Sequence, residues 1–182
     1  MVIKPFKINP DEFLVPWTSI ASSFFEAYSI SKDKSSIVPG QELLNGVDLI
    51  TKIAFEDYAS GVSKEEKKAF LYNIDGMVDM LAYSQGLKFP NVGWGATALP
   101  DSFWLTTAGR AIVLALDEIL GDRFCSLRSA SKLMNFDTRR LYNLANAKQI
   151  PYYLHPGIRN PKQKRRIRLD HLEMILKAGD SG

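Results

Sequence analysis

Residues 125–177 constrain the fold most, because apolar residues at helical spacing alternate there with strong turn signals. Leu127, Ala130, Leu133 and Met134 share one face of a first short helix. The sequence Asn-Phe-Asp follows at 135–137. Asn tolerates the left-handed backbone of a tight turn, and Asp is a good N-cap for a following helix. We therefore predict two short helices joined by a tight turn.

The second helix of this pair, residues 138–147, carries two different faces. Leu141, Leu144 and Ala145 are predicted to point inward. Four polar or aromatic residues at i, i+3, i+4 and i+7 share the opposite face: Arg139, Tyr142, Asn143 and Asn146. In a DNA major groove Arg suits guanine, Asn suits adenine, and Tyr suits phosphate or apolar contacts. This face is therefore a candidate for reading base edges.

A basic hairpin is predicted after the second helix. Residues 150–154 are extended because Pro151 forbids further helix, and residues 166–169 alternate polar and apolar side chains and can pair with them. Residues 155–165 form the tip, with two prolines and a cluster of cations. Asp170 is expected to cap a last helix, whose Leu172, Ile175 and Leu176 close the core. Six cations are candidates for phosphate contact or for insertion into a minor groove: Arg159, Lys162, Lys164, Arg165, Arg166 and Arg168.

A family resemblance rests on these residues. The run Ala130-Ser131-Lys132-Leu133-Met134-Asn135-Phe136-Asp137-Thr138-Arg139-Arg140-Leu141-Tyr142 resembles the Ala-Ala-x-Leu-Leu-x-Val-Ser-x-x-Thr-Leu-Tyr pattern of excisionase-like and MerR-like winged helix-turn-helix domains. Ile150-Pro151, the basic hairpin and Arg-Ile-Arg-Leu-Asp-His-Leu at 166–172 continue it. The chain departs from the pattern in two places: Lys148 stands where Gly is frequent, and the hairpin is longer than usual. The resemblance covers about the last third of the chain.

The resemblance implies a DNA-binding domain whose second helix enters the major groove and whose wing touches the backbone. That family includes transcription regulators, recombination directionality factors, phage packaging subunits and architectural proteins, among which the motif does not choose. No cofactor and no metal are expected. The DNA-binding candidates are Thr138, Arg139, Arg140, Tyr142, Asn143, Asn146, Lys148, Arg159, Lys162, Lys164, Arg165, Arg166 and Arg168.

Charge divides the chain of 182 residues unevenly. Residues 123–182 hold 13 Lys and Arg against 4 Asp and Glu, a net charge of +9, whereas residues 1–122 have a net charge of −6. A basic segment behind an acidic one indicates a polyanionic partner for the C-terminal part. We therefore predict a mainly α protein: a helical domain at 1–122 for dimerisation or partner binding, and a winged helix-turn-helix domain with a β-hairpin wing at 123–182.

The sequence of the N-terminal part predicts about four or five helices and contains no motif that indicates a reaction. Asn9 and Pro10 begin a first helix with an aromatic and apolar stripe through residues 13–28, and residues 29–40 form a loop. Apolar residues at 43–54 mark a second helix that ends near Gly61, and a Ser63–Glu66 capping box opens a third, which ends near Gly86. A loop or short strand fills 86–100. Thr106 or Thr107 caps a fourth, nearly all-apolar helix that ends near residue 121.

Other functional classes are weakly supported. His155, His171 and Cys125 lack metal-ligand or nucleophile spacing, so no enzyme is expected. No apolar run suits a membrane span, no secretory signal is visible, and a single cysteine fits a reducing cytoplasm. We expect a cytoplasmic, nucleoid-associated protein that binds double-stranded DNA as a homodimer through its N-terminal helices. A protein–protein adaptor, or an RNA- or membrane-associated basic protein, are the alternatives.

Overall fold

The computed structural model describes residues 50, 53, 63–84, 86–87 and 94–179. The predicted first helix, its aromatic stripe and the loop at 29–40 lie outside these residues. Of the predicted second helix, Ile50 and Ile53 are described, and both are helical and fully buried.

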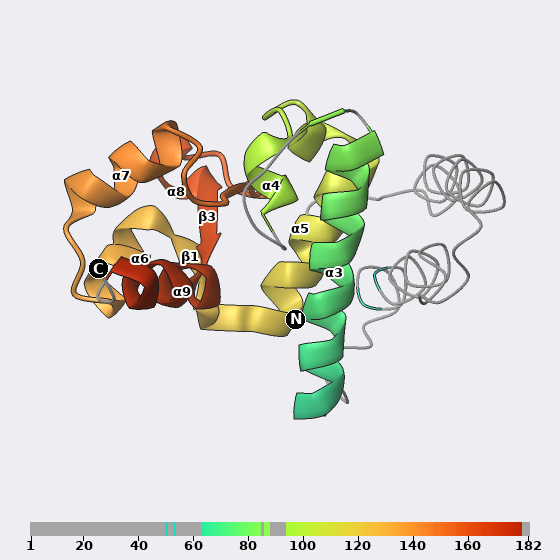
Figure 1. The fold of residues 1–182 in the computed structure, drawn as a ribbon, viewed down its shortest axis with the longest axis horizontal. Coiled ribbons are helices and arrows are strands. Elements are labelled where there is room, and N and C mark those ends of the chain that lie inside the picture. The colour runs from blue at the N-terminus through green and yellow to red at the C-terminus, as the bar shows by residue number, and fades with distance from the viewer. Residues whose placement is uncertain (1–49, 51–52, 54–62, 85, 88–93, 180–182) are drawn as a thin grey trace, which may run out of the picture.

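The described chain is mainly helical with a small antiparallel sheet (Figure 1). The predicted mainly α class is therefore confirmed. The elements in order are α3 (Lys64–Ser84), α4 (Gly95–Ala98), η2 (Phe103–Leu105), α5 (Thr107–Leu120), η3 (Gly121–Arg123), β1 (Phe124–Ser126), α6 (Leu127–Leu133), α7 (Thr138–Asn146), β2 (Tyr153–Leu154), α8 (Pro161–Lys164), β3 (Arg165–Arg168) and α9 (Leu169–Gly179).

The long helix α3 begins at the predicted capping box. The backbone N–H of Glu66 donates to Ser63 Oγ at 3.2 Å, and the Glu66 carboxylate accepts from the N–H of Ser63 at 2.8 Å. Two of the four N–H groups that a helix leaves unpaired are thereby satisfied. The helix ends as predicted before Gly86, whose φ of 71° lies in the left-handed region. Helical spacing places six apolar residues on its inward face, of which Leu71 is half-buried and the others are buried: Phe70, Ile74, Met77, Val78 and Leu81.

Two glycines allow short helical elements to approach longer helices. Within the predicted loop at 86–100 the chain forms α4, whose Gly95 N–H donates to Asp79 Oδ1 of α3 at 2.7 Å. A Cβ at Gly95 would come within 2.8 Å of the α3 backbone. In α5, a Cβ at Gly109 would lie 2.3 Å from the Phe103 carbonyl oxygen of η2. Both close packings therefore require glycine. Thr106 caps α5, as expected.

Helices α6 and α7 both end in a turn with a left-handed residue other than glycine. Asn135 has φ 48°, and the Phe136 N–H donates to the Ser131 carbonyl at 2.9 Å. Lys148 has φ 55°, and the Gln149 N–H donates to the Leu144 carbonyl at 2.9 Å. Both are Schellman-type ends, which satisfy carbonyls that the helix leaves free. The tight turn is therefore confirmed. One part of the predicted apolar face is wrong: Leu133 is 62% exposed.

The sheet has three strands in the order β1-β3-β2, whereas the sequence predicted a two-stranded hairpin. β2 pairs with β3 with Tyr153 opposite Arg166, close to the predicted pairing. The unpredicted β1 pairs along the other edge of β3, with Cys125 opposite Ile167. The expected irregular tip contains the helical turn α8, capped by the Asn160 side chain, with Pro161 in its first turn. Asp170 is not the cap of α9, since the helix begins at Leu169 and Asp170 lies in its first turn.

The two segments of the chain, on either side of residue 122, share a core. Phe124 and Tyr153 from the basic segment belong to the same buried cluster as Trp104, Ile112 and other residues of the N-terminal part. The rings of Trp104 and Tyr153 meet edge to face at 5.0 Å, and those of Phe124 and Tyr153 at 5.5 Å. A second cluster, which includes Leu127, Leu141, Ile167 and Leu172, lies under α6, α7 and α9. Aromatic packing therefore holds the sheet against η2.

Candidate nucleic-acid interface

The outer face of α7 carries several of the polar candidates. Arg139, Arg140 and Asn143 are exposed on α7, while Leu141 and Ala145 are buried beneath them. Asp137 caps the helix as predicted, since its Oδ1 accepts from the Arg140 N–H at 2.6 Å. The helix is therefore fixed at its start, and its exposed side is polar.

Some α7 candidates are already engaged within the fold. The Thr138 hydroxyl makes a hydrogen bond to the Ser131 hydroxyl of α6, which also donates to the Phe136 carbonyl at 2.7 Å. Tyr142 is half-buried and packs against the second core cluster. The Arg140 guanidinium lies 5.3 Å from the centre of the Phe136 ring. These contacts fix the angle between α6 and α7.

The C-terminal end of α7 is joined to the sheet through a polar cluster around Tyr152. Arg165 donates to Asn146 Oδ1 at 2.6 Å, and its guanidinium lies 4.9 Å from the centre of the Tyr152 ring. The Tyr152 hydroxyl donates to Asp101 at 2.7 Å. Lys148 donates to the same carboxylate at 3.3 Å and to the Leu99 carbonyl at 3.0 Å. Lys148 and Tyr152 thus connect the basic segment to the loop before η2, and Arg165 joins β3 to α7.

These contacts shift the pKa values of Tyr152 and Asp101. Burial, the hydrogen bond to Asp101 and its negative charge together raise the pKa of Tyr152 to about 12. Burial alone would raise the pKa of Asp101, but hydrogen bonds from Tyr152 and Lys148 and the nearby cations outweigh it and lower that pKa. The cluster therefore holds a neutral phenol beside an ionised carboxylate at neutral pH.

Arg166 is half-buried at 21% side-chain exposure and forms an ion pair with Asp117 of α5 at 3.2 Å. His155 Nε2 lies 3.4 Å from the other oxygen of the same carboxylate. His155 Nδ1 accepts from the Gly157 N–H, so in the neutral ring the proton sits on Nε2 and faces Asp117. Burial raises the pKa of Asp117, but the contacts of His155 and Arg166 outweigh it and lower the pKa. The base of the hairpin is therefore tied to α5.

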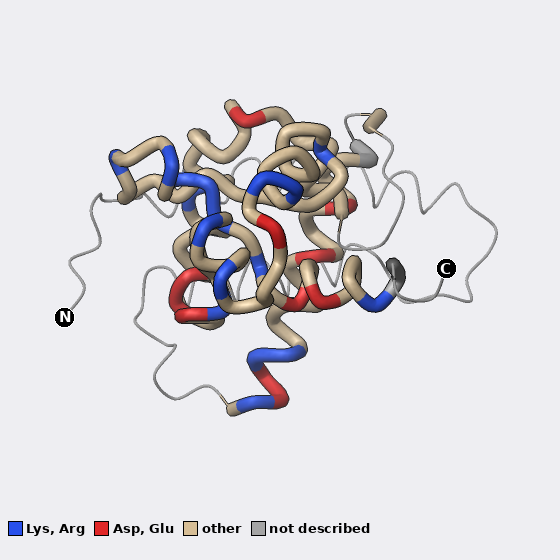
Figure 2. The backbone as a smooth tube through the Cα atoms, turned by 90° about the vertical axis from the view of Figure 1, so that its left-hand side faces the viewer, with Lys and Arg blue, Asp and Glu red and all other residues tan. Residues whose placement is uncertain are grey.

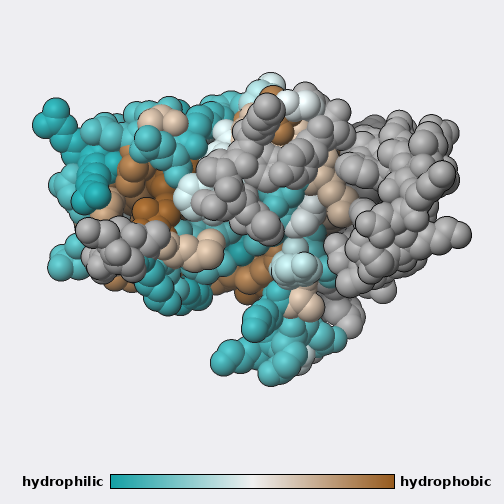
Figure 3. All heavy atoms as spheres, in the orientation of Figure 1, coloured by the Kyte–Doolittle hydropathy of each residue, from teal (hydrophilic) through white to brown (hydrophobic). Residues whose placement is uncertain are grey.

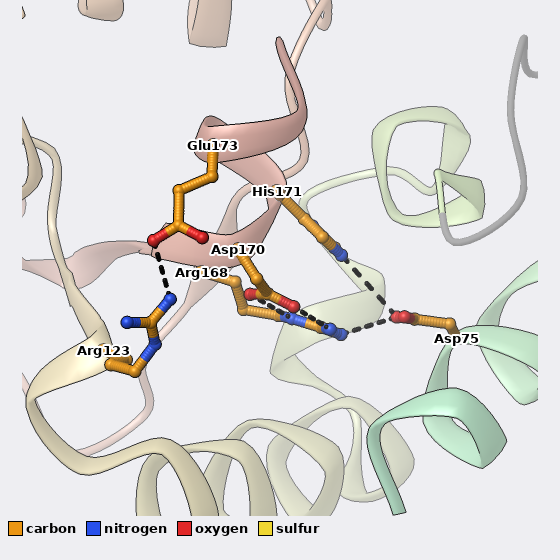
Figure 4. A network of polar contacts seen from close by, with 6 residues as sticks. All are labelled: Asp75, Arg123, Arg168, Asp170, His171 and Glu173. Atoms are coloured by element: carbon orange, nitrogen blue, oxygen red, sulfur yellow. Dashed lines mark hydrogen bonds and ion pairs between the residues drawn. The ribbon is translucent and has the colours of Figure 1, made fainter. Parts of the chain in front are cut away.

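Arg168 is the candidate that the structure removes from the surface. Its side chain is 2% exposed and donates to Asp75 of α3 and to Asp170, both at 2.6 Å (Figure 4). His171 is 1% exposed, with Nε2 3.8 Å from Asp75 Oδ1. Arg168 was predicted to touch phosphate, and that prediction is wrong because its guanidinium is enclosed between two carboxylates. It links β3 to α3 and α9 instead.

Another group of cations remains exposed and has no acidic partner within the described part of the chain. It includes Arg128 and Lys132 of α6, which the sequence reasoning missed although their i, i+4 spacing places them on one helical face. The other members are Arg139 and Arg140 of α7 and Arg159, Lys162 and Lys164 of the hairpin tip, of which Lys164 is half-exposed. Figure 2 faces the side on which α6 and α7 lie in Figure 1, and Lys and Arg positions recur along the tube there.

Side chains of the kinds that bind metal ions do not cluster among the described residues. Among them, no group of three or more His, Cys, Asp or Glu side chains could hold a metal ion. Cys125 is buried in the second core cluster, and burial raises the pKa of its thiol. No helix within the part of the chain that the structure covers is long and apolar enough to cross a membrane.

Comparison of the chain with protein-family models, with curated proteins and with solved structures finds no match.

Proposed function

We propose that the chain binds duplex DNA through residues 123–182, folded as a winged helix-turn-helix in which α7 enters the major groove. The order of elements supports this proposal. A helix (α5), a strand (β1), two helices joined by a tight turn (α6 and α7) and two further strands (β2 and β3) follow one another, with the sheet order β1-β3-β2. In this arrangement α7 lies at the surface and the β2–β3 hairpin lies beside it, as a recognition helix and a wing require.

The division of the basic side chains into two groups carries the proposal. Cations at the base of the sheet are neutralised by acidic residues of the N-terminal part, as in the pairs Arg166–Asp117 and Arg168–Asp75. Within residues 123–182, the exposed cations without an acidic partner among the described residues lie on α6, α7 and the hairpin tip, away from those contacts. A basic segment that pairs its inner cations and leaves these outer ones exposed offers a face for a polyanion.

Within this face, different side chains have different roles in the proposal. Arg139 and Asn143 are exposed on α7 and take part in none of the ion pairs described above. In the proposal their side chains form hydrogen bonds with the edges of the bases. Lys162 and Lys164 of the tip, together with Arg128 and Lys132 of α6, contact phosphates on either side of the groove. Asn146 holds Arg165 and has a positioning role.

Duplex binding measured by fluorescence anisotropy over a range of salt concentrations tests the proposal. Each phosphate contact contributes about 0.9 to the slope of log K against log salt, so seven exposed cations predict a slope of at most about 6 per chain. Arg139→Ala and Asn143→Ala are expected to weaken binding to a site selected from random DNA by about 1–3 kcal/mol each, and random duplex much less. No salt-sensitive duplex binding at low salt would contradict the proposal and leave the protein–protein adaptor.

A matched pair of variants separates this interface from a general attraction to positive charge. Lys164→Gln and Arg166→Gln each remove one cation from neighbouring residues of the hairpin. Lys164 is not neutralised, whereas Arg166 is paired with Asp117. Lys164→Gln should reduce the salt slope by about 1, and Arg166→Gln should leave it nearly unchanged. Equal effects of the two substitutions would show that pairing with an acid does not decide which cations contact the DNA.

The proposal includes a homodimer formed through the N-terminal helices, so that two copies of α7 meet two half-sites. Tyr72, 65% exposed on α3, offers an apolar contact for such an interface. Sedimentation analysis with and without DNA tests this part separately. A strict monomer under both conditions would contradict the dimer but not the duplex binding.

A further inference from the structure

A cavity of about 580 Å³ lies between the N-terminal end of α3 and the C-terminal end of α5. Figure 1 shows the N-terminal end of α3 extending beyond the neighbouring helices, and Figure 3 shows hydrophobic residues beside this hydrophilic projection. Its volume falls in the usual range for small-molecule sites. The lining residues are Lys64, Glu65, Lys67, Lys68, Leu71, Ile119, Leu120 and Arg123.

The lining combines an apolar floor with a cationic rim. Leu71 of α3 and Ile119 and Leu120 of α5 supply the floor, and all three are buried or half-buried. Four cations and one acid surround it, so the lining has a net charge of +3. The cations come from two separate elements, α3 and η3. An apolar surface framed by like charges from two elements matches a ligand with an apolar body and a negative head.

Among the described residues, few acids compete with such a head for the cations of the rim. Lys64, Lys67 and Lys68 form no ion pair with any acid that the structure describes. Arg123 donates one N–H, from NH2, to Glu173 at 2.7 Å, and its side chain is 53% exposed, so other donors of the guanidinium remain available. Nearby Glu66 is held by Ser63 in the capping box and does not line the cavity.

We propose that this cavity binds a small amphipathic organic anion, with its apolar body on Leu71, Ile119 and Leu120 and its carboxylate, sulfonate or phosphate between Lys67 and Arg123. The site is built by α3, α5 and η3 and uses none of the residues assigned to DNA. A failure of the proposed duplex binding would therefore not contradict this inference, and a failure of this inference would not contradict duplex binding. Through Arg123 and Glu173 the head group lies next to a contact that joins η3 to α9.

Titration of the full chain with 8-anilinonaphthalene-1-sulfonate, followed by fluorescence and calorimetry, tests the inference. One molecule should bind per chain, and equimolar sodium sulfate should not displace it because sulfate lacks the apolar body. 1-Naphthylmethylammonium, which has a similar ring and the opposite charge, should bind at least about tenfold more weakly. Binding of several molecules without saturation, or equal binding of the cation, would overturn the proposal.

A charge-matched pair of double variants locates the site. Lys67→Gln with Arg123→Gln removes two cations from the rim and should weaken binding about tenfold, since each exposed charge contributes a factor of about two to five. Arg128→Gln with Lys132→Gln removes two cations from α6 and should change binding less than about twofold. Circular dichroism confirms that both variants fold. Equal weakening by the two pairs would mean attraction to the net charge of the protein and would refute a built site.

Discussion

Replacing Arg168 by methionine is expected to destabilise the fold by about 2–3 kcal/mol. Methionine keeps much of the apolar volume of the arginine stem but leaves Asp75 and Asp170 without their shared cation. Breaking a fully buried pair costs about 3–5 kcal/mol. The cost here is smaller because the two carboxylates retain 18% and 36% exposure. For a chain of this size, thermal unfolding should shift down by about 5–10 °C.

Urea denaturation at pH 7 measures the effect, and a double-mutant cycle isolates the pair. Asp75→Asn combined with Arg168→Met should be less destabilising than the sum of the single changes by about 1–2 kcal/mol. Arg166→Met is the matched control: its pair with Asp117 is more exposed, at 21% and 39%, and should cost about 1 kcal/mol or less. Equal losses at the two positions, or strict additivity in the cycle, would refute the view that Arg168 joins β3 to α3.

The acid range gives an independent check of the same contact. Burial raises the pKa of Asp170, but the hydrogen bonds and charge of Arg168 outweigh it and hold the pKa below the ordinary value of an aspartate side chain. A carboxylate with a lowered folded pKa stabilises the fold above its unfolded pKa, and this contribution is lost as the pH falls through the folded value. Wild-type stability should therefore fall more steeply below about pH 4 than that of Arg168→Met. Parallel pH profiles would contradict this reasoning.

Three further predictions follow from single contacts. Asp101→Asn should lower the pKa of Tyr152 from about 12, because the carboxylate charge is removed while burial remains; ultraviolet pH titration against the wild type measures this. Asp137→Ala should cost about 1 kcal/mol of unfolding free energy through loss of the α7 N-cap, measured by urea denaturation; no loss would contradict the capping role. Leu133→Ser should change stability by less than about 0.5 kcal/mol, whereas Leu141→Ala should cost about 2–5 kcal/mol in the same assay; similar values would contradict their difference in burial.

Local features of the fold were predictable because their causes lie within a few residues along the chain. The Ser63–Glu66 capping box, the Thr106 and Asp137 caps and the left-handed turn at Asn135 all involve groups three to five residues apart. Their side chains and backbone geometry have strong intrinsic preferences. Helical periodicity also placed most inward residues correctly, although it could not show that the core ends before Leu133.

The candidate site was predicted only in part, because sequence gives the type of a side chain and not its partner. The exposed face of α7 followed from spacing, and Arg139 and Asn143 lie on it. The same spacing argument was available for Arg128 and Lys132, one turn apart on α6. For the cations near the hairpin, positive charge alone did not distinguish Lys162 at the surface from Arg168 in the interior. Nothing local marks a cation that will be enclosed.

By itself, the sequence determined a mainly helical chain, an acidic part followed by a basic one, and a pair of short helices with a tight turn between them. Only the tertiary structure decided that β1 adds a third strand and which cations form ion pairs with acidic residues. Arg168 and Asp75 are 93 residues apart in the chain, and Arg166 and Asp117 are 49 apart. Contacts at such separations form when packed helices bring the groups together, because desolvation then makes an unpaired charge costly and selects the partner that lies within reach.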